Sequence, residues 1–446
     1  MRILLGWRRM PKKNSNQPEK EKGSGEFKIS TSIDQLLLAA LDRDDESLET
    51  GRYVITYKEN AIDDGIQSLK SQGMRSADAR DFQDQGITVE DVGDADAVVF
   101  PEIGVAVVGG EAFEQRGLSV NAEIASDSPV EAVEPEYFVF AAPVADDYLL
   151  GFVRAAEIIA KDLIRNGQAL KEEMDVDVEV LGATSGLIQC KVPPSLRSGA
   201  GMKVAVLDTG MDLGHPDFAG RVFTTQTFVG QPVQDLHSHG THCIGTACGP
   251  KSPVGSTPRY GIAYRAPIFV GKVLSNSGSG TTASVLAGMN WAIANRCPVI
   301  SMSLGSQSPV QAAYTAAGTA ALTQGCLIIA AAGNAASNTG APANSPTIMS
   351  VASLDPNLTP SSFSNFGKIE ISAPGRDVFS SVPRPTRYGT KSGTSMATPH
   401  VAGCAALWAE TNPALRGMNL WNKLQATAKP LPLPPVRVGK GLVQAP

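Results

Sequence analysis

A series of short, nearly continuous apolar runs, separated by glycine-rich turns, restricts the fold of the second half of the chain more than any other feature. Runs that lack polar alternation indicate strands buried on both faces, which is typical of a parallel sheet. Helical segments between them, Ala283–Ala294 and Val310–Thr323, predict helices that cover this sheet. The predicted fold class is therefore α/β, a parallel sheet in a three-layer arrangement. The runs are Lys203–Leu207, Ile268–Val273, Val299–Leu304, Leu327–Ala332 and Met349–Ala352.

The first half of the chain has a different pattern of expected strands and helices. A strand pattern at Tyr53–Tyr57 is followed by an amphipathic stretch and further β-rich runs that end with Pro129–Phe140, which predicts a small α/β sandwich. Apolar residues then recur at helical spacing between Asp146 and Glu173, which predicts a connecting helix. We expect a flexible lead-in over residues 1–50 with one short apolar run at Ile33–Leu41, a small domain over 51–142, a helical connector over 143–186 and a large domain over 187–446.

Charge is distributed unevenly along the chain. Residues 1–186 carry 36 acidic and 19 basic side chains, a net charge of −17, whereas residues 187–446 carry 8 acidic and 19 basic side chains, a net charge of +11. The basic side chains are scattered and form no Lys/Arg cluster with interleaved aromatic residues, which argues against nucleic-acid binding. Opposite charges on two parts of one chain favour their mutual attraction.

Cysteine usage and the N-terminus exclude some functions and leave others open. The six cysteines lie between Cys190 and Cys404 without a CxxC pair, so a zinc cluster is not expected, and both thiols and disulfides remain open. No apolar stretch reaches the roughly 20 residues of a membrane span. Basic residues follow the short apolar patch at Ile3–Leu5, the reverse of a secretory signal, so the compartment stays unknown, with secreted and intracellular locations both open.

Three segments of the second half carry residues suited to catalysis. Asp208 ends an apolar strand, His237-Ser-His-Gly-Thr-His242 holds three of the five histidines, and Gly393-Thr-Ser-Met-Ala-Thr-Pro-His400 places Ser395 before a helix of small residues. Taken separately, these segments have simpler interpretations. Asp208 could be a turn residue, the histidine group could bind a metal, and Ser395 could be a helix N-cap. In the order Asp, His, Ser they match one of the known arrangements of a catalytic triad.

These motifs resemble the three signature motifs of the subtilisin-like (subtilase) serine peptidases. The segment Ala330-Ala-Ala-Gly-Asn334 resembles the one that supplies the family's oxyanion-hole asparagine, and the resemblance extends over about Leu187–Pro446. It implies that Ser395 is the nucleophile, that His239, the histidine directly before Gly-Thr, is the general base, and that Asp208 orients His239. Asn334 and the backbone N–H of Ser395 would stabilise the oxyanion.

The same resemblance implies a peptide-binding cleft. Ser303, Leu304 and Gly305 resemble the strand that pairs with the substrate backbone, and Gly278, Ser279 and Gly280 resemble the opposite edge. Extended protein or peptide substrates would bind between these edges by strand addition. Gly333 and Gly340 would line the pocket for the residue before the cut, and small residues there predict a roomy, uncharged pocket for apolar or aromatic side chains.

The resemblance to the family says least about the cofactors and metals of this chain. The chemistry requires no cofactor, and structural calcium is left open and unassigned. Asp217 matches one ligand that many family members use, but the segment Gly249–Gly255 does not resemble the loop that supplies the others. Cys243 follows the histidine motif, as in a minority branch of the family that resembles proteinase K, and we expect it to be an inert buried thiol.

The acidic first half is interpreted through the same family. Residues 53–142 resemble the family's inhibitory prodomains, and Ala132–Phe140 resembles their closing strand, which would lead a tail into the active-site cleft. We expect Ser395 to make a first cut between Phe140 and Asp146, so that the chain removes its own prodomain. The alternative is a non-hydrolytic peptide-binding or acyl-transferring relative that keeps its front half as a permanent interaction module.

Overall fold

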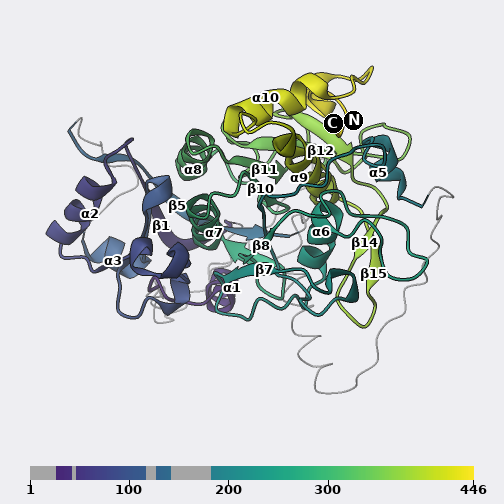
Figure 1. Cartoon of the computed structure of the whole chain (residues 1–446). Coiled ribbons are helices and arrows are strands. Elements are labelled where there is room, and N and C mark those ends of the chain that lie inside the picture. The colour runs from purple at the N-terminus through teal and green to yellow at the C-terminus, as the bar shows by residue number, and fades with distance from the viewer. Residues whose placement is uncertain (1–26, 43–46, 117–126, 142–181) are drawn as a thin grey trace, which may run out of the picture.

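The computed structural model describes residues 27–42, 47–116, 127–141 and 182–446 of the 446-residue chain. The predicted fold class is confirmed: a large α/β unit built on a parallel sheet is preceded by a smaller α/β unit, and the two lie side by side (Figure 1). We call residues 27–141 the N-terminal unit and residues 182–446 the large unit. The connector helix predicted between Asp146 and Glu173 lies outside the described residues.

The large unit is organised around a seven-stranded sheet with the order β13-β12-β11-β10-β6-β8-β7. Its paired strands all run parallel, with Val299 of β10 opposite Val204 of β6. The carboxyl ends of these strands therefore meet at one edge, where active sites of such sheets form. The strands are β6 (Val204–Asp208), β7 (Phe223–Thr227), β8 (Ile268–Lys272), β10 (Val299–Met302), β11 (Leu327–Ala331), β12 (Met349–Leu354) and β13 (Ile371–Pro374).

Helices cover both faces of this sheet, which explains the continuous apolar runs. Along β6, Val204 and Val206 pack with helices α6 and α9, whereas Ala205 and Leu207 pack with α7 and α8 on the other face. Successive side chains of a strand point to opposite faces, so a strand between two helical layers is apolar at every position. The helices of the large unit are α5 (Ser185–Gln189), α6 (His239–Cys248), α7 (Thr282–Ala294), α8 (Ala312–Thr323), α9 (Thr394–Thr411), α10 (Gly417–Thr427) and α11 (Pro435–Val438), with a 3-10 turn η5 (Pro216–Phe218).

The N-terminal unit contains a mixed sheet that continues into the large unit. Its strand order is β2-β3-β4-β1-β5-β9, in which the last strand, β9 (Ser279–Thr281), belongs to the large unit. Only the β2–β3 pair is parallel. The elements are α1 (Ile33–Asp42), β1 (Glu49–Tyr57), α2 (Ile62–Ser71), β2 (Ser76–Asp78), η1 (Ala79–Asp81), η2 (Gln83–Gln85), η3 (Val89–Asp91), β3 (Ala97–Phe100), η4 (Pro101–Ile103), β4 (Val105–Val108), α3 (Gly110–Gln115) and β5 (Val130–Phe140).

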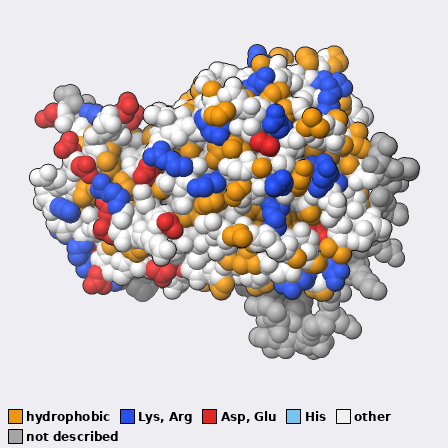
Figure 2. Space-filling view, in the orientation of Figure 1, with side chains coloured by type: hydrophobic (Ala, Val, Ile, Leu, Met, Phe, Trp, Pro, Cys, Tyr) orange, Lys and Arg blue, Asp and Glu red, His pale blue; other side chains and the backbone are white. Residues whose placement is uncertain are grey.

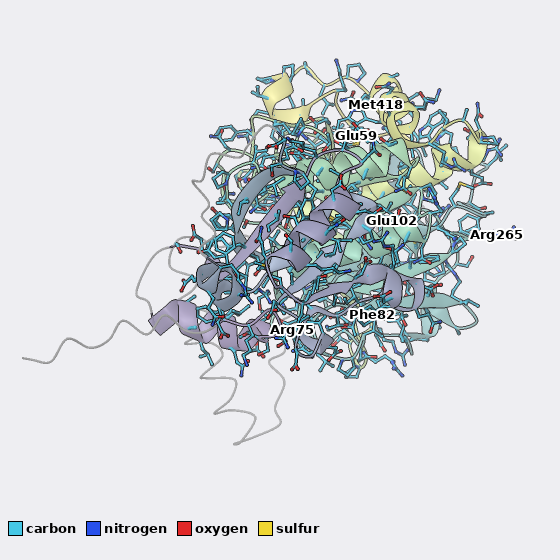
Figure 3. The ribbon with its side chains drawn as sticks, turned by 90° about the vertical axis from the view of Figure 1, so that its left-hand side faces the viewer. Glu59, Arg75, Phe82, Glu102, Arg265 and Met418 are labelled. Atoms are coloured by element: carbon cyan, nitrogen blue, oxygen red, sulfur yellow. The ribbon has the colours of Figure 1, made fainter. Side chains whose placement is uncertain are left out.

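This sheet is buried on both faces, and only one of them is covered by its own helices. Ile55 and Val99 pack with α2 and α3, whereas Val54, Val98 and Val107 pack with α7 and α8 of the large unit. The second face is therefore an interface between the two units. Glu102, labelled in Figure 3, lies at this interface, where its backbone N–H donates to Asn290 Oδ1 of α7 (2.9 Å) and its carboxylate accepts from Gln324 (2.9 Å).

Part of the predicted lead-in is packed rather than flexible. Residues 33–42 form helix α1, whose Ile33, Leu36 and Leu37 lie in one apolar cluster with Phe138 of β5 and Val229 of the large unit. This short helix thus contacts both units. It covers a side chain of β5, the strand that leads toward the large unit.

The uneven charge of the sequence is visible on the surface. In Figure 2 the acidic side chains gather over the N-terminal unit, and lysine and arginine side chains predominate over the large unit on this face. No helix among the described residues combines the length and the apolar character that crossing a membrane requires. All six cysteines are buried thiols.

An ion pair between the buried carboxylate of Asp212 and the half-exposed guanidinium of Arg384 holds the loop that follows β6. The Asp212 carboxylate accepts from Arg384 Nη2 at 2.8 Å and from Arg384 Nε at 2.9 Å, and it also accepts the Arg384 backbone N–H at 3.0 Å. Strands β14 (Val378–Ser381) and β15 (Tyr388–Lys391) form a two-stranded sheet, and Arg384 lies in the segment between them. Burial alone raises the pKa of Asp212, but the hydrogen bonds and charge of Arg384 outweigh it and lower the pKa to about 2.

We predict that Arg384→Met destabilises the protein in a pH-dependent way. A carboxyl whose folded-state pKa is depressed contributes stability above its ordinary value of 3.8 and loses it as the pH falls through about 2. The difference in free energy of unfolding between wild type and variant should be largest above pH 3.8 and should shrink toward pH 2, as measured by urea unfolding. Arg197→Met, at an exposed arginine, is the control. If the difference in free energy of unfolding between wild type and Arg384→Met stays constant with pH, Arg384 does not lower the pKa of Asp212.

Candidate active site

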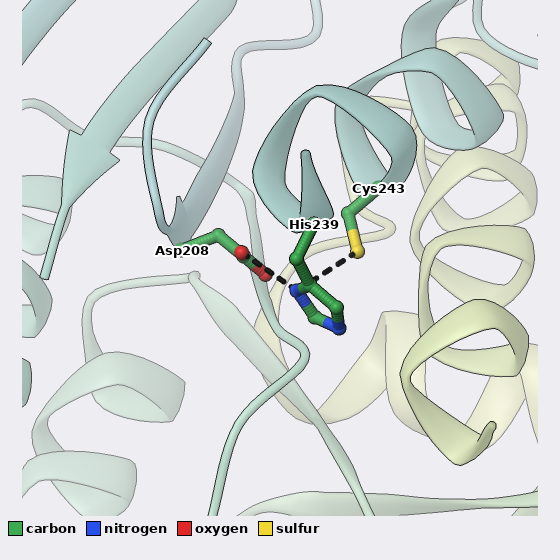
Figure 4. Close-up of side chains that lie close together, drawn as sticks. All are labelled: Asp208, His239 and Cys243. Atoms are coloured by element: carbon green, nitrogen blue, oxygen red, sulfur yellow. Dashed lines mark hydrogen bonds and ion pairs between the residues drawn. The ribbon is translucent and has the colours of Figure 1, made fainter. Parts of the chain in front are cut away.

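The parallel sheet and helix α6 bring Asp208 and His239 together. Asp208 is the last residue of β6, and His239 is the first residue of α6. The Oδ1 atom of Asp208 lies 2.8 Å from Nδ1 of His239, and both side chains are buried (Figure 4). The Thr209 backbone N–H donates to the same carboxylate oxygen at 2.8 Å. The carboxylate therefore fixes Nδ1 as the protonated ring nitrogen and leaves Nε2 available as a base.

The surroundings of His239 favour its charged form. Burial alone lowers the pKa of His239, but the Asp208 carboxylate outweighs it and holds the pKa above its ordinary value. Cys243 lies one helical turn further along α6, with its Sγ 3.9 Å from His239 Nδ1 (Figure 4). Burial raises the pKa of the Cys243 thiol. This thiol is therefore neutral at physiological pH, and Asp208 is the anion that faces the ring.

Ser395 lies at the start of α9, where the chain has an unusual hydrogen-bond pattern. The backbone N–H groups in the first turn of a helix have no intrahelical acceptor, so the N–H of Ser395, the second residue of α9, is free to bind an anion. Pro399, four residues later, has no N–H to donate to the Ser395 carbonyl. That carbonyl accepts instead from Ser303 Oγ (2.8 Å) and from the Cys243 thiol (3.6 Å). Side chains from two other elements thus hold the backbone of Ser395.

The hydroxyl of Ser395 faces two backbone carbonyls. Its Oγ lies 3.2 Å from the carbonyl oxygen of Ala141 and 3.3 Å from that of Ser303. Ala141 follows strand β5 of the N-terminal unit. A peptide carbonyl of this chain therefore lies directly beside the hydroxyl that the motifs single out.

Asn334 is held with its amide in a defined orientation. Its Oδ1 accepts from the backbone N–H and from the hydroxyl of Thr394, each at 2.7 Å. Because the carbonyl end of the side chain is used in this way, the Nδ2 donors point away from Thr394. Asn334 and the N–H of Ser395 are brought to the same region, since Thr394 and Ser395 are consecutive residues.

The two predicted substrate-binding edges lie on either side of the end of β5. Val139 of β5 lies opposite Gly280 of β9, and Phe140 lies opposite Ser279. On the other side, Phe140 and Gly305 exchange both backbone hydrogen bonds, each at 3.0 Å. The Ala141 N–H then donates to the carbonyl of Gly278 at 2.9 Å.

Glycine is required at both edges because other backbone segments come close to them. A Cβ atom at Gly280 would lie 2.5 Å from the Val273 carbonyl oxygen, and one at Gly305 would lie 2.7 Å from the Ala341 carbonyl oxygen. Side chains at these positions would displace the edge strands. Leu304, between Ser303 and Gly305, is buried in the core shared with α7 and α8.

Gly333 and Gly340 belong to the loop next to Asn334. Gly333 has φ of +107°, which glycine adopts without strain, and the Gly340 N–H donates to the Ala332 carbonyl at 3.1 Å. Asn365, which carries no recognisable motif, organises this loop: its side chain donates to the carbonyls of Ala332 and Asn338 and accepts from Ala335 and Ser337.

The three histidines of the motif have different surroundings. The Nε2 atom of His242 lies 2.9 Å from the Val378 carbonyl, and the rings of His237 and His239 lie 6.1 Å apart between centroids. Burial lowers the pKa of His237 to about 4 and that of His242 to about 3, so both are neutral at neutral pH. His239 instead groups with Asp208 and Cys243.

Asp217 does not fit the role of a calcium ligand. Its carboxylate accepts from the Val254 backbone N–H (2.8 Å), from the Tyr260 hydroxyl (2.6 Å) and from the Tyr388 hydroxyl (3.0 Å). A calcium ion needs these oxygen lone pairs, and here hydrogen-bond donors use them. The residue, which lies in η5, links the segment after α6 to β15.

Two further buried charges lie close to the Asp208–His239 pair, Asp235 and Lys272. Asp235 precedes the histidine motif, and Lys272 is the last residue of β8. A weak signal for Lys272 exists in the sequence, since it is the one charged residue inside the apolar run Ile268–Val273. The contacts of both residues come from segments far apart in the chain.

Comparison with known proteins identifies the family of this chain. Residues 199–441, more than half of the chain, match the model of the subtilase family. An alkaline protease of Alkalihalobacillus alcalophilus is 38% identical over 283 residues, which cover 62% of this chain and 72% of the relative. Subtilisin Savinase of Lederbergia lenta is 41% identical over 252 residues, 56% of this chain and 90% of the relative.

Comparison with solved structures indicates the same class of protein, the subtilisin-like serine proteinases. The crystal structure of a cold-adapted subtilisin-like serine proteinase superposes with a TM-score of 0.52 at 32% identity, covering 59% of this chain and 99% of the other. The chain belongs to the subtilase family of serine peptidases. It is a subtilisin-like hydrolase that acts on peptide substrates, and members of this family need no cofactor for catalysis.

Proposed function

We propose that the chain is a serine endopeptidase in which Asp208, His239 and Ser395 form the catalytic triad. Ser395 Oγ attacks the carbonyl carbon of the scissile peptide bond, and His239 Nε2 takes the hydroxyl proton and delivers it to the leaving amine. The 2.8 Å hydrogen bond to Asp208 supports this assignment, because it sets the ring tautomer that the base needs and stabilises the imidazolium that forms.

The oxyanion of the tetrahedral intermediate is assigned to two donors. The Asn334 Nδ2 group is one, since Thr394 occupies the other end of the amide, and the Ser395 backbone N–H at the start of α9 is the second. Donors that are oriented before the reaction stabilise developing charge without reorganisation. Water then hydrolyses the acyl-enzyme to complete the cleavage.

The observation that carries the proposal is the position of β5. An extended peptide segment lies between two edge strands, and the Ala141 carbonyl lies 3.2 Å from Ser395 Oγ. This is the placement that strand addition gives to a peptide substrate. Backbone hydrogen bonds dominate the contacts, so the site suits extended peptides of varied sequence, and Gly333 and Gly340 leave room for an apolar side chain before the cut.

The position of β5 also supports an inhibitory role for residues 51–142. The strand fills the cleft that a substrate needs, and it is anchored by two carboxylates at helix N-termini of the large unit. Glu134 accepts from the backbone N–H groups of Ala312 (2.8 Å) and Ala313 (3.4 Å) in the first turn of α8. Glu136 accepts from the N–H of Ala283 (2.9 Å) in the first turn of α7.

A buried cation completes the second anchor. Arg52 of β1 contacts Glu136 at 2.5 Å and 3.0 Å, and its Nη2 also donates to Thr281 Oγ1 of the large unit at 3.2 Å. Arg52 and Glu136 are both almost fully buried. Removing either partner alone would leave a buried charge unpaired, so this pair favours one docking arrangement of the two units.

We propose that Ser395 cuts the chain once between Phe140 and Asp146, after which the N-terminal unit stays bound as an inhibitor until it dissociates. Residues 142–146 lie outside the described residues. The alternative of a non-hydrolytic relative is not favoured by the comparisons, since the matched relatives are proteases by name.

The first experiment compares the wild-type chain with Ser395→Ala. We expect the intact mass of the wild type to show loss of its front half, with a new N-terminus between residues 141 and 146. Ser395→Ala should keep its full mass because it lacks the nucleophile.

Two results would overturn this proposal. Processing of Ser395→Ala at the same position would exclude Ser395 as the nucleophile. Cleavage of casein by a wild type that remains intact would make the N-terminal unit a permanent module.

Asn334→Leu should lower kcat for a chromogenic peptide by about 10²–10³-fold with little change in KM, the loss known for removing such a donor in a subtilisin. The donor acts on the oxyanion, which exists only after the attack, so ground-state binding is spared. Asn357→Leu, at an exposed loop, serves as the control. An equal rise in KM without a fall in kcat would place Asn334 in substrate binding instead.

Glu134→Ala should shorten the lag between self-cleavage and full activity about fivefold, because losing a helix-cap acceptor costs about 1 kcal/mol. Burial raises the pKa of Glu134 above its ordinary value despite the two N–H donors. Glu134→Gln keeps an acceptor oxygen for the same N–H groups, so it should keep a lag close to that of the wild type. Glu131→Ala, an exposed glutamate on the same strand, should leave the lag unchanged. An unaltered lag for Glu134→Ala would argue against this anchor.

A further inference from the structure

The residue after Asp208, Thr209, is held by four hydrogen bonds. The N–H of Thr209 donates to Asp208 Oδ1 at 2.8 Å, and its hydroxyl donates to Asp235 Oδ1 at 3.0 Å while accepting from the Gly240 N–H at 2.8 Å. Its carbonyl accepts from Lys272 Nζ. Every polar group of Thr209 is engaged, so Asp235 and Lys272 determine how the turn that carries Asp208 is oriented.

Asp235 also organises the segment that leads into His239. Its Oδ1 accepts from the N–H groups of His237 and Ser238, each at 2.9 Å, and its Oδ2 accepts from the N–H (2.9 Å) and hydroxyl (2.7 Å) of Thr241. Ser238 has φ of +81°, a left-handed conformation that costs energy for a residue other than glycine. The bonds to Asp235 compensate for this strain directly before His239.

Lys272 is a buried ammonium whose direct contacts are neutral. Its side chain is fully buried, and apart from the Thr209 carbonyl its Nζ donates to Asn276 Oδ1 at 2.9 Å. Among the described residues, Asp235 and Asp208 are the carboxylates that act on it through space. Burial lowers the pKa of Lys272 to about 8, although these two carboxylates oppose the shift. A buried charge without a direct counter-ion is costly, which points to a role beyond packing.

We propose that Asp235 and Lys272 are positioning residues for the Asp208–His239 pair, which act through Thr209, and that the Lys272 ammonium offsets the second negative charge that Asp235 places beside His239. This inference rests on the proposed function, since it concerns the proposed general base. Two carboxylates without a cation would hold His239 protonated over a wider pH range. A general base is most effective when its pKa lies near the working pH.

The other titratable groups around His239 do not change charge in the pH range that matters. Cys243, on the same helix, is a neutral thiol, and His237 and His242 are neutral above about pH 4. Lys391 of β15 lowers the pKa of both of these histidines. Cys243, His237 and His242 therefore stay neutral over the acid limb of kcat/KM, which reports His239, and the Lys272 ammonium loses its proton only near pH 8.

The electrostatic part is tested with Lys272→Met in the full-length chain after self-processing. The acid limb of kcat/KM for a chromogenic peptide should move to higher pH by roughly one unit, the size expected for loss of one nearby charge. Lys203→Met is the matched control, because Lys203 precedes the neighbouring strand β6 and donates to the Asn295 carbonyl (2.8 Å) away from His239. An acid limb for Lys272→Met that coincides with that of the wild type overturns the electrostatic role.

The positioning part is tested with Asp235→Asn. Its kcat, expressed per active site titrated with a sulfonyl fluoride, should fall about 10²-fold at nearly constant KM, since small misplacements of a catalytic group cost this much. Asp217→Asn, at another buried carboxylate, should lower the melting temperature and leave kcat per site unchanged. A normal kcat per site for Asp235→Asn would reduce that residue to a structural role and overturn the inference.

The experiments distinguish a failure of the proposed function from a failure of this inference. A wild type without peptidase activity, or an active Ser395→Ala, removes the proposed function and this inference together. A normal wild type accompanied by unchanged Lys272→Met and Asp235→Asn variants removes only the inference.

Discussion

The hydrogen bond between Asp208 and His239 joins the end of a buried strand to the beginning of a helix, and the rest of the site is arranged around it. Strand β6 is central in the parallel sheet, so the position of Asp208 is fixed by neighbours on both sides. Helix α6 packs against the same sheet and against α9, which carries Ser395. The three motifs thus converge because one sheet and two helices share a single core.

The same backbone geometry explains how one cleft can take both a substrate and part of its own chain. Edges at Gly278–Gly280 and Ser303–Gly305 offer hydrogen bonds to any extended segment, and β5 uses them. Under the proposed function, inhibition and substrate recognition differ in what lies outside the cleft. The N-terminal unit adds helix-cap contacts through Glu134 and Glu136 that a short peptide lacks.

The sequence predicts local features well and long-range contacts poorly. Apolar runs predict the buried parallel sheet, and short motifs locate Asp208, His239 and Ser395, because the necessary information lies within a few residues. Asp235 and Lys272 escape such reasoning, since their partners come from distant segments. The match of Asp217 to a calcium ligand fails for the same reason: the tyrosine hydroxyls that use its oxygens come from distant positions of the chain.

The continuous apolarity of β3 and β4 has a consequence for the fate of the N-terminal unit. Val98 and Val107 belong to a sheet face that packs in one apolar cluster with α7 and α8 of the large unit. Once separated, the unit would present this face, and the unpaired edge of β5, to solvent. An apolar sheet face with a free edge is a site for aggregation and for proteolytic attack. Under the proposed self-processing, activation would then be irreversible in practice, because the released N-terminal unit is degraded or aggregates and does not return.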